Sequence, residues 1–484
     1  MRKVRIFTLF LSIILLCSTV FGSFSASAAF TPKFALNSEA VYMVNTDTDI
    51  VVVSKNADKK MWPASTTKIM TCLVALENIK NFDAYVLCPY TAFNEFQKEY
   101  GNPNYVGPSS AAIEPRQTNI TYWDLLYALM VRSGCEAANI LAYNIGGESI
   151  ENFIAMMNAK AKEIGCKNTH FSNAHGLWDE NNYTTAYDLY LITKYAIDNY
   201  PRFMEICDTY SYDMPANEFN PEGYTITQTN KLMQSTSEYY YEGVHGIKTG
   251  SIDCYYPKQP DGSYDYEKVE DGCRTLVTTA EKNGFHYIIV SLGAPYYTED
   301  GTNLSFKDHI DLYDWAFTEF EYTLVIKKNE QITQIGVDKG KDADTVGLIV
   351  TEDYYTLLPK SLDHSTIQRI CEPITDKLEA PVDKDMEMGN LQLRLNGETL
   401  ANMKLVTEDY VELDMQEYYK EKVLDFVKDK RFIAIVIGVG LLIVLLTVTS
   451  ALRKNHNKRV AEMNKRRKIS SMPPKKKNNN IRRR

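Results

Sequence analysis

The sequence predicts an α/β sandwich, in which helices cover an antiparallel sheet, followed by a small all-β domain and a C-terminal transmembrane helix. Three observations lead to this fold class. A strand hairpin is followed by a block of helices and then by three further strands, an order typical of helices packed on an antiparallel sheet. From about residue 321 short alternating strands take over. Residues 432–452 read FIAIVIGVGLLIVLLTVTSAL, without a charge.

The N-terminal 28 residues have the pattern of a signal peptide. Three basic residues among the first five precede an apolar stretch, and Ala-Ser-Ala at 26–28 has the small-residue pattern of a cleavage site. We therefore expect export and a mature chain that begins near Ala29. An uncleaved membrane anchor is the alternative interpretation.

The elements of the sandwich follow in order. Residues 40–54 read AVYMVNTDTDIVVVS, two strands around a polar turn, and predict an edge hairpin. Apolar spacing predicts a helix over about 65–78. The stretch 121–147 predicts two helices separated by an exposed turn. The strand GVHGIKTGS at 243–251 precedes two strands joined at Asn283-Gly284, a strong hairpin signal.

Beyond the sandwich, expected at 30–325, the chain changes character. YTLVIKK, TVGLIV and LQLRLNG predict a small β domain over 326–415, and a charged amphipathic linker at 416–431 leads to the apolar run at 432–452. That run is long enough to cross a bilayer. The tail at 453–484 carries 14 Lys or Arg against one acid, so the positive-inside rule places it in the cytoplasm, beside anionic lipid.

The charge of the exported part argues against nucleic acid as a partner. The whole chain has a net charge of -9. Without the 3 basic residues of the signal peptide, and the 14 basic residues and one acid of the tail, 36 basic residues face 61 acidic ones, near -25. Such an acidic surface repels nucleic acid and suits a domain that works at the cell envelope.

Neither the cysteines nor the histidines form a metal-site pattern. The spacings of the cysteines match no zinc motif. In an exported chain some cysteines form disulfides, and Cys254 with Cys273 is the pair to test first; isolated buried thiols are the alternative. His170 and His175 lie near Asp179 but form no H-E-x-x-H arrangement, so we expect them to be structural loop residues.

Ser65 and Lys68 stand three residues apart in PASTTKIM. On a helix, residues with this spacing are neighbours on one face. A serine hydroxyl is a weak nucleophile that needs a base, and a lysine serves as one if its surroundings lower its pKa. A serine before an apolar helix is also a preferred N-cap. The local sequence fits both interpretations.

Two further motifs favour the nucleophile. RSGCEAAN places Ser133 in a turn after an apolar helix, and Lys248-Thr249-Gly250 lies in a strand, where a glycine lets a substrate backbone approach the edge. The order S-x-x-K, then a second serine motif, then K-T-G is the set of penicillin-binding proteins and class A β-lactamases.

With these motifs the chain resembles the low-molecular-mass penicillin-binding proteins that are serine-type D-alanyl-D-alanine carboxypeptidases. FSNAHGL at 171–177, TTAYDLYLITKYA at 184–196 and TQTNKLM at 227–233 support the resemblance. It implies a β-lactamase/penicillin-binding-protein-like sandwich followed by the family's small β domain. It also implies an activity that removes the terminal D-alanine from peptidoglycan stem pentapeptides and limits cross-linking, with β-lactam antibiotics as inhibitors and no metal or cofactor.

The resemblance also implies a role for each motif residue. Ser65 would attack the carbonyl between two D-alanines, with Lys68 taking its proton and Ser133 relaying a proton to the leaving D-alanine. The acyl-enzyme would then be hydrolysed by water.

Five residues are implied to bind substrate. Lys248 would tune the proton network, and Thr249, beside Gly250, would help to hold the terminal carboxylate. The backbone N–H groups of Ser65 and Ser251 would form the oxyanion hole. Cys135 departs from the family pattern, which has asparagine there; a thiol is a weaker donor and acceptor than an amide.

Two other functions remain as alternatives. One is a β-lactamase, against which the additional β domain and the membrane span argue. The other is a non-catalytic or weakly catalytic penicillin-binding wall protein, in which Cys135 has reduced turnover.

Overall fold

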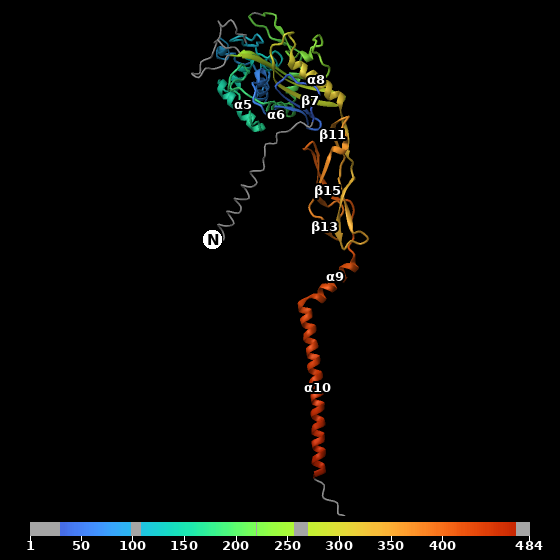
Figure 1. Ribbon diagram of the computed structural model, residues 1–484. Helices are drawn as coiled ribbons and strands as arrows, with labels where there is room; N and C mark the ends of the chain where they lie inside the picture. Colours follow the sequence, from blue (N-terminus) through green and yellow to red (C-terminus); the bar gives the residue numbers. More distant parts are fainter. Residues whose placement is uncertain (1–29, 98–107, 219, 256–269, 471–484) are drawn as a thin grey trace, which may run out of the picture. The chain divides into compact units, whose positions relative to one another are not determined.

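The computed structural model describes residues 30–97, 108–218, 220–255 and 270–470 (Figure 1). The predicted signal peptide, most of the insert between Cys254 and Cys273, and the end of the basic tail lie outside these ranges. The chain separates into two compact units. The first comprises the chain up to Lys328 with residues 352–370 and 391–403, and the second comprises residues 329–351, 371–390 and 404–484.

The first unit contains an antiparallel sheet with the strand order β2-β1-β7-β6-β5. The predicted hairpin forms β1 and β2, and β2 is an edge strand, as expected. Lys282 pairs with Phe285, so Asn283-Gly284 is a two-residue turn, and both turn residues have positive φ, as a type I′ turn requires. The strand with the Lys-Thr-Gly triplet, β5, is the other edge. The bounds are β1 Ala40–Asn45, β2 Ile50–Lys55, β5 Val244–Tyr255, β6 Glu270–Lys282 and β7 Phe285–Pro295.

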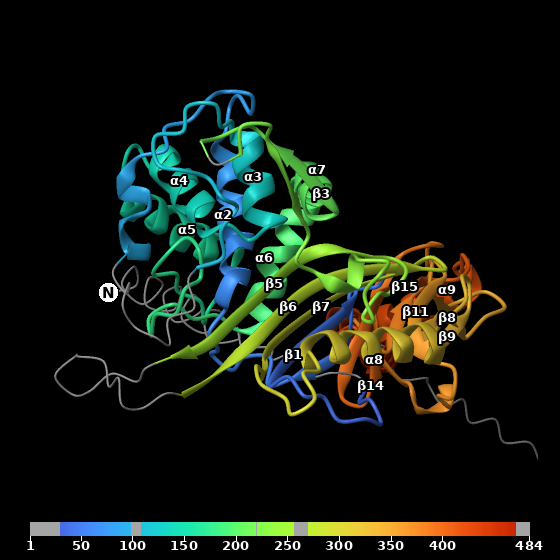
Figure 2. The same cartoon turned by 90° about the horizontal axis from the view of Figure 1, so that it is seen from above.

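Helices cover both faces of this sheet. Figure 2 shows α2 to α6 on one side and α8 on the other, where α8 packs against β6 and β7. This arrangement confirms the predicted sandwich. No helix was expected at α8, although Asn303 caps its start by accepting from two backbone N–H groups. The bounds are α2 Thr67–Asn78, α3 Tyr122–Met130, α4 Cys135–Ile145, α5 Ile150–Ile164, α6 Ala186–Asn199, α7 Pro201–Cys207 and α8 Leu304–Glu319; a ribbon of β3 Ser211–Met214 and β4 Tyr224–Thr227 follows α7.

Helix α2 lies at the centre of the helical layer. It contacts α3 to α7 and strand β5, and its residues from Thr67 to Leu76 are all buried. A helix that is apolar on every side must be enclosed by other elements. One polar residue with an ionisable group, Lys68, is enclosed with it and has no exposed surface. The fold therefore removes the Lys68 ammonium from water.

After α8 the chain forms short strands. β8 pairs with β11, and a further sheet has the order β12-β14-β15-β10-β9-β13. YTLVIKK, TVGLIV and LQLRLNG overlap β8, β10 and β14, which confirms the predicted β character, whereas the boundaries of 30–325 and 326–415 stay predictions. The bounds are β8 Phe320–Ile326, β9 Gln331–Asp338, β10 Thr345–Ile349, β11 Tyr354–Pro359, β12 Gln368–Pro373, β13 Lys377–Glu379, β14 Glu387–Leu395 and β15 Glu398–Thr407.

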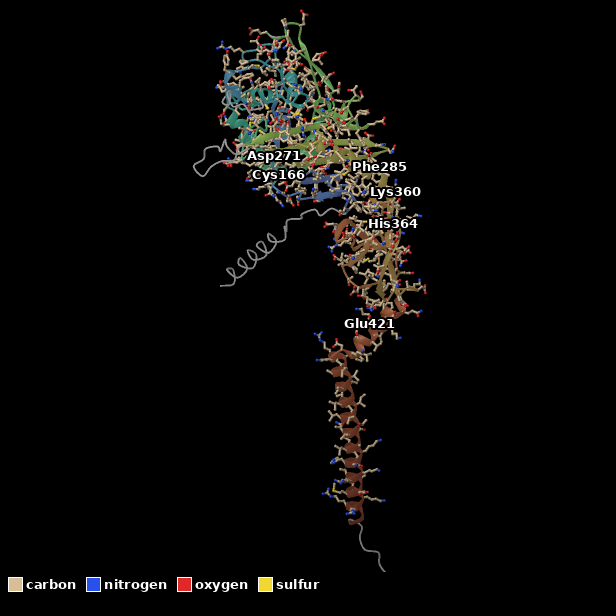
Figure 3. All side chains as sticks on the ribbon, turned by 45° about the horizontal axis from the view of Figure 1, so that its top comes forward. Cys166, Asp271, Phe285, Lys360, His364 and Glu421 are labelled. Atoms are coloured by element: carbon tan, nitrogen blue, oxygen red, sulfur yellow. The ribbon has the colours of Figure 1, made fainter. Side chains whose placement is uncertain are left out.

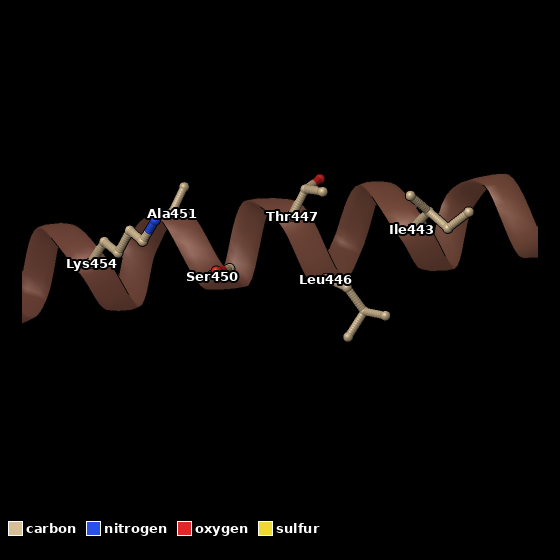
Figure 4. A pocket seen from close by; sticks show the side chains of 6 residues that line it. All are labelled: Ile443, Leu446, Thr447, Ser450, Ala451 and Lys454. Atoms are coloured by element: carbon tan, nitrogen blue, oxygen red, sulfur yellow. The ribbon is translucent and has the colours of Figure 1, made fainter.

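Two helices end the described chain, α9 at Met415–Lys428 and α10 at Lys430–Ser470. Among the described residues, α10 is the one helix long and apolar enough to cross a membrane, and it contains the predicted span at 432–452. Figure 3 shows nitrogen-tipped side chains along its C-terminal half. The hollow in Figure 4, lined by six residues from Ile443 to Lys454, is formed by this helix alone, so it is a groove on the helix surface.

Candidate active site

Ser65 lies in a short 3₁₀ turn, Ala64–Thr66, directly before α2. Its Oγ accepts a hydrogen bond from Nζ of Lys68 at 2.9 Å. No side chain caps the start of the turn or of α2, so the interpretation of Ser65 as a helix cap is wrong. The turn and the first residues of α2 bring the two groups together, as their spacing predicts.

The Lys68 ammonium lies at the meeting point of three segments. Besides the bond to Ser65, Nζ donates to the carbonyl of His175 at 2.6 Å and lies 3.4 Å from Sγ of Cys135. Burial lowers the pKa of Lys68, against the opposite influence of Cys135 and Glu136, because a dry environment disfavours the charged form. A neutral lysine can accept the proton of a bonded hydroxyl.

Ser133 lies in the turn between α3 and α4, as predicted, but the expectation that this turn exposes it is wrong, because only 4% of Ser133 is exposed. Its φ of 68° is in the left-handed region, and the residue is buried. Two residues later Cys135 begins α4, with its thiol beside Lys68. The structure therefore brings the second motif to the first through Cys135, the position at which this chain departs from the family pattern.

The third motif lies on the edge strand β5. Lys248 is fully buried, and its Nζ donates to the carbonyl of Thr249 at 2.9 Å. Burial and the nearby charge of Lys68 hold the pKa of Lys248 well below its usual value. The Thr249 hydroxyl shares a hydrogen bond of 2.7 Å with that of Thr229. Two buried lysines thus approach the same site from different elements.

Gly250 brings β5 against the turn that carries Ser65. A Cβ added at Gly250 would lie 2.9 Å from the backbone N of Ser65 and 2.3 Å from Oγ1 of Thr275. Gly250 was expected to let a substrate backbone approach the strand edge. In the structure the backbone of Ser65 already lies close to it. Ser251, the next residue, is exposed. The backbone N–H donors of the predicted oxyanion hole accordingly come from two adjacent segments.

Two known protein families match parts of this chain. The pattern of the D-alanyl-D-alanine carboxypeptidases matches residues 25–254, and that of the penicillin-binding protein 5 C-terminal domain matches residues 320–413. The D-alanyl-D-alanine carboxypeptidase of Streptomyces sp. strain K15 is 33% identical over 248 residues, which cover 49% of this chain and 79% of that protein. The chain belongs to the D-alanyl-D-alanine carboxypeptidase family.

Other relatives match a larger share of this chain. The D-alanyl-D-alanine carboxypeptidase DacF of Bacillus subtilis is 28% identical over 406 residues, which cover 83% of this chain and 92% of that protein. The crystal structure of DacD from Francisella tularensis has a TM-score of 0.58 at 22% identity, over 79% of this chain and 95% of that one. The family and fold class predicted from the motifs are confirmed. Members of this family act on peptidoglycan and are bound by β-lactams.

The loop at 173–177 supports the site of the carboxypeptidase. FSNAHGL at 171–177 contributed to the resemblance, but no role in the site was predicted for it. Its His175 carbonyl accepts the hydrogen bond from Lys68. Gly176 has a φ of 84°, and a Cβ there would lie 1.9 Å from the carbonyl oxygen of Ala64. The signal in the sequence is the run Asn-Ala-His-Gly, typical of a turn, but its contact with the nucleophile's turn is non-local.

His170 and His175 have separate hydrogen-bond partners. Nδ1 of His170 lies 2.7 Å from the carbonyl of Asn181, and Nδ1 of His175 accepts from the N–H of Leu177 at 3.1 Å. Among the described residues no group of three His, Cys, Asp or Glu side chains gathers as a metal site. His175 supports the site through its carbonyl instead.

The cysteine pair Cys254 and Cys273 is only partly described. Cys273 is a free thiol, whereas the side chain of Cys254 lies outside the described residues. In the β5–β6 ladder Ile252 pairs with Cys273, and Cys254 pairs with Asp271. The insert that follows Cys254, at 256–269, also lies outside the described residues.

Proposed function

We propose that this carboxypeptidase removes the terminal D-alanine from peptidoglycan stem pentapeptides through an acyl-enzyme on Ser65. The observation that carries the proposal is the 2.9 Å hydrogen bond between Oγ of Ser65 and the buried Nζ of Lys68. A nucleophilic serine needs a base within hydrogen-bond reach whose pKa suits its task. Lys68 has the required contact, and its burial provides the lowered pKa.

The reaction begins with neutral Lys68. The Oγ of Ser65 attacks the carbonyl carbon between the two D-alanines while its proton passes to Lys68. The C–N bond then breaks, and the leaving amine takes a proton through Ser133. Water attacks the resulting ester, gives up a proton to the same network and restores the Ser65 hydroxyl. Ser65, Lys68 and Ser133 are the catalytic residues of this scheme.

The β5 edge would hold the substrate. Lys248 tunes the proton network by its proximity to Lys68, and Thr249, beside Gly250, binds the terminal carboxylate. The backbone N–H groups of Ser65 and Ser251 stabilise the oxyanion; the close approach of Gly250 to the N of Ser65 supports this placement. Cys135 is the remaining substrate contact. A β-lactam would acylate Ser65 in the same way and be released slowly.

We further propose that α10 anchors the enzyme as a single membrane span, with the catalytic part outside the cell and the basic tail in the cytoplasm. The apolar helix at Lys430–Arg467 supports the anchor, and the positive charge of the tail supports the orientation. The enzyme then trims stem pentapeptides close to the membrane, limits cross-linking and contacts membrane lipid, with no nucleic-acid partner.

The proposal is tested on the full-length protein in detergent. Diacetyl-lysyl-D-alanyl-D-alanine serves as substrate and a labelled penicillin as probe, with Ser65→Ala as the variant and Ser235→Ala, an exposed serine, as its matched control. We expect D-alanine release and slow penicillin turnover, both lost in Ser65→Ala and kept in the control.

Other outcomes separate the alternatives. Fast hydrolysis of the penicillin would indicate a β-lactamase. Labelling without D-alanine release would indicate a penicillin-binding wall protein, and recovery of release in Cys135→Asn would then locate the defect. Absence of labelling in the folded wild-type protein would overturn the assignment to Ser65.

A further inference from the structure

The segment that precedes α3 is fastened to both sides of Ser133. The hydroxyl of Ser109 donates to the carbonyl of Ser133 at 2.5 Å, and the carbonyl of Ser109 accepts from the N–H of Cys135 at 2.8 Å. Ser109 itself is exposed, whereas Ser133 is buried. We call residues 109–113 the clamp. Its first residue, Ser109, is hydrogen-bonded to the backbone at Ser133 and at Cys135.

Glu136 holds this clamp from the protein interior. Its Oε1 accepts hydrogen bonds from the hydroxyl of Ser110 at 2.7 Å and from the N–H of Ala111 at 2.6 Å. The N–H of Ile113 is a third donor, at 3.4 Å. Glu136 is only 4% exposed. Burial raises the pKa of Glu136, against the opposite influence of these hydrogen bonds. Because all three donors meet at one oxygen, that oxygen fixes most of the clamp.

The position of Glu136 does not by itself explain these contacts. An acidic residue in the first turn of a helix such as α4 often stabilises the positive end of the helix dipole. The three donors on Oε1 instead belong to a segment outside the helix. The clamp therefore depends on the side chain of the residue that directly follows Cys135.

The clamp matters because the backbone of Ser133 is strained. Its φ of 68° is unfavourable for any residue with a side chain and persists only where the surroundings enforce it. The next residue, Gly134, is packed against the same groups: a Cβ there would lie 3.1 Å from Cβ of Ala111 and 3.3 Å from Oε2 of Glu136. The clamp and Glu136 are thus the surroundings that enforce the turn.

We propose that Glu136 is a positioning residue for acylation, which acts through the clamp to hold Ser133 in the backbone conformation that presents its hydroxyl to the site. This inference rests on the proposed roles of Ser65 and Ser133. Glu136 does not touch the reacting atoms. Its loss would slow the chemical step while leaving the β5 edge, and hence substrate binding, in place.

The test uses the full-length protein in detergent and two pairs of variants. Ser109→Ala and Glu136→Ala remove the clamp's bonds, whereas Ser109→Thr and Glu136→Gln keep a hydroxyl and an acceptor oxygen. Ser149→Ala is the matched control, because it also removes a hydrogen bond between a serine hydroxyl and the backbone, here at the start of α5. The rate constant for acylation by labelled penicillin, kcat and KM for D-alanine release, and the melting temperature are measured for each.

We expect Ser109→Ala to acylate about fivefold more slowly, the effect of about one hydrogen bond, and Glu136→Ala at least tenfold more slowly. KM should change less than about twofold, and Ser109→Thr and Glu136→Gln should stay within about threefold of the wild type. Ser149→Ala should lose stability without losing rate. Because Ser109 is exposed, its variants test the inference even if Glu136→Ala does not fold.

The inference is overturned if Ser109→Ala acylates at the wild-type rate, or if each variant's loss of rate equals its loss of folded protein. It is also overturned if KM rises and kcat does not fall. Failure of the proposed function looks different, since the wild-type protein itself would then release no D-alanine, whether or not it is labelled.

Discussion

Gly176 offers the sharpest test of how the site is assembled. In Gly176→Ala the added Cβ would lie 1.9 Å from the carbonyl oxygen of Ala64. Real Cβ contacts essentially never fall below 3.0 Å, so the two segments must separate by at least 1.1 Å, the difference between these distances. Ala64 directly precedes Ser65, and a misplacement of about 1 Å costs about 100-fold in rate. We expect acylation to fall by about that factor.

The assay is single-turnover labelling by a fluorescent penicillin, with circular dichroism to confirm folding. Gly165→Ala is the matched control: Gly165 also has positive φ, 100°, but a Cβ there meets no atom within 4 Å. Both variants carry the cost of left-handed backbone, about 1–2 kcal/mol, and only Gly176→Ala disturbs Ser65. If the two folded variants acylate at similar rates, the loop does not position the nucleophile.

Three further predictions concern single side chains. Lys68→Arg keeps a cation but cannot accept a proton, so we expect no acylation by labelled penicillin at any pH. In the wild type the rate should rise with pH at values below the usual lysine pKa, because neutral Lys68 is the active form. Cys135→Ala should lower the acylation rate about fivefold, the effect of one hydrogen bond, and Cys135→Asn should restore it. Burial lowers the pKa of His309 to about 3, so below pH 6.5 the unfolded chain binds a proton that the folded chain does not. Between these two pKa values the free energy of unfolding should therefore fall by up to about 1.4 kcal/mol per pH unit of acidification, and His309→Gln should remove this contribution in urea titrations.

Each of these has a contradicting result. Measurable acylation by Lys68→Arg would exclude Lys68 as the required base. A Cys135→Ala enzyme as fast as wild type would show that the thiol is a filler rather than a contact. Parallel pH profiles of unfolding for wild type and His309→Gln would show that His309 titrates normally in the fold.

The residues of the site that could be predicted are those whose spacing along the chain is short and regular. Ser65 and Lys68 are three residues apart, and Lys248 belongs to a triplet on one strand, so motif and period alone identify them. The hairpin at Asn283-Gly284 was predictable for the same reason, since its turn chemistry lies in two adjacent residues.

The supports of the site were not predictable, because they depend on contacts between distant segments. Gly176 matters only through Ala64, more than a hundred residues earlier. In the sequence Glu136 is an ordinary acidic residue in the first turn of a helix. Only the structure shows that it accepts hydrogen bonds from the clamp. The cap interpretation of Ser65 is wrong because α2 begins at Thr67, and Ser65 lies in the 3₁₀ turn that precedes it.

The last prediction follows from the burial of Lys248. Its pKa is held well below the usual value by burial and by the charge of Lys68, so at neutral pH the unfolded chain binds this proton more strongly than the folded chain does. Each unit of lowered pKa corresponds to about 1.4 kcal/mol of lost stability. Because this cost is absent from an apolar side chain of similar length, Lys248→Met should raise the melting temperature at pH 7 while D-alanine release falls. The gain in stability should shrink as the pH rises toward the lysine's unfolded pKa. A variant that melts lower than wild type at pH 7 would show that Lys248 stabilises the fold, and that its burial is not a stability cost accepted for function.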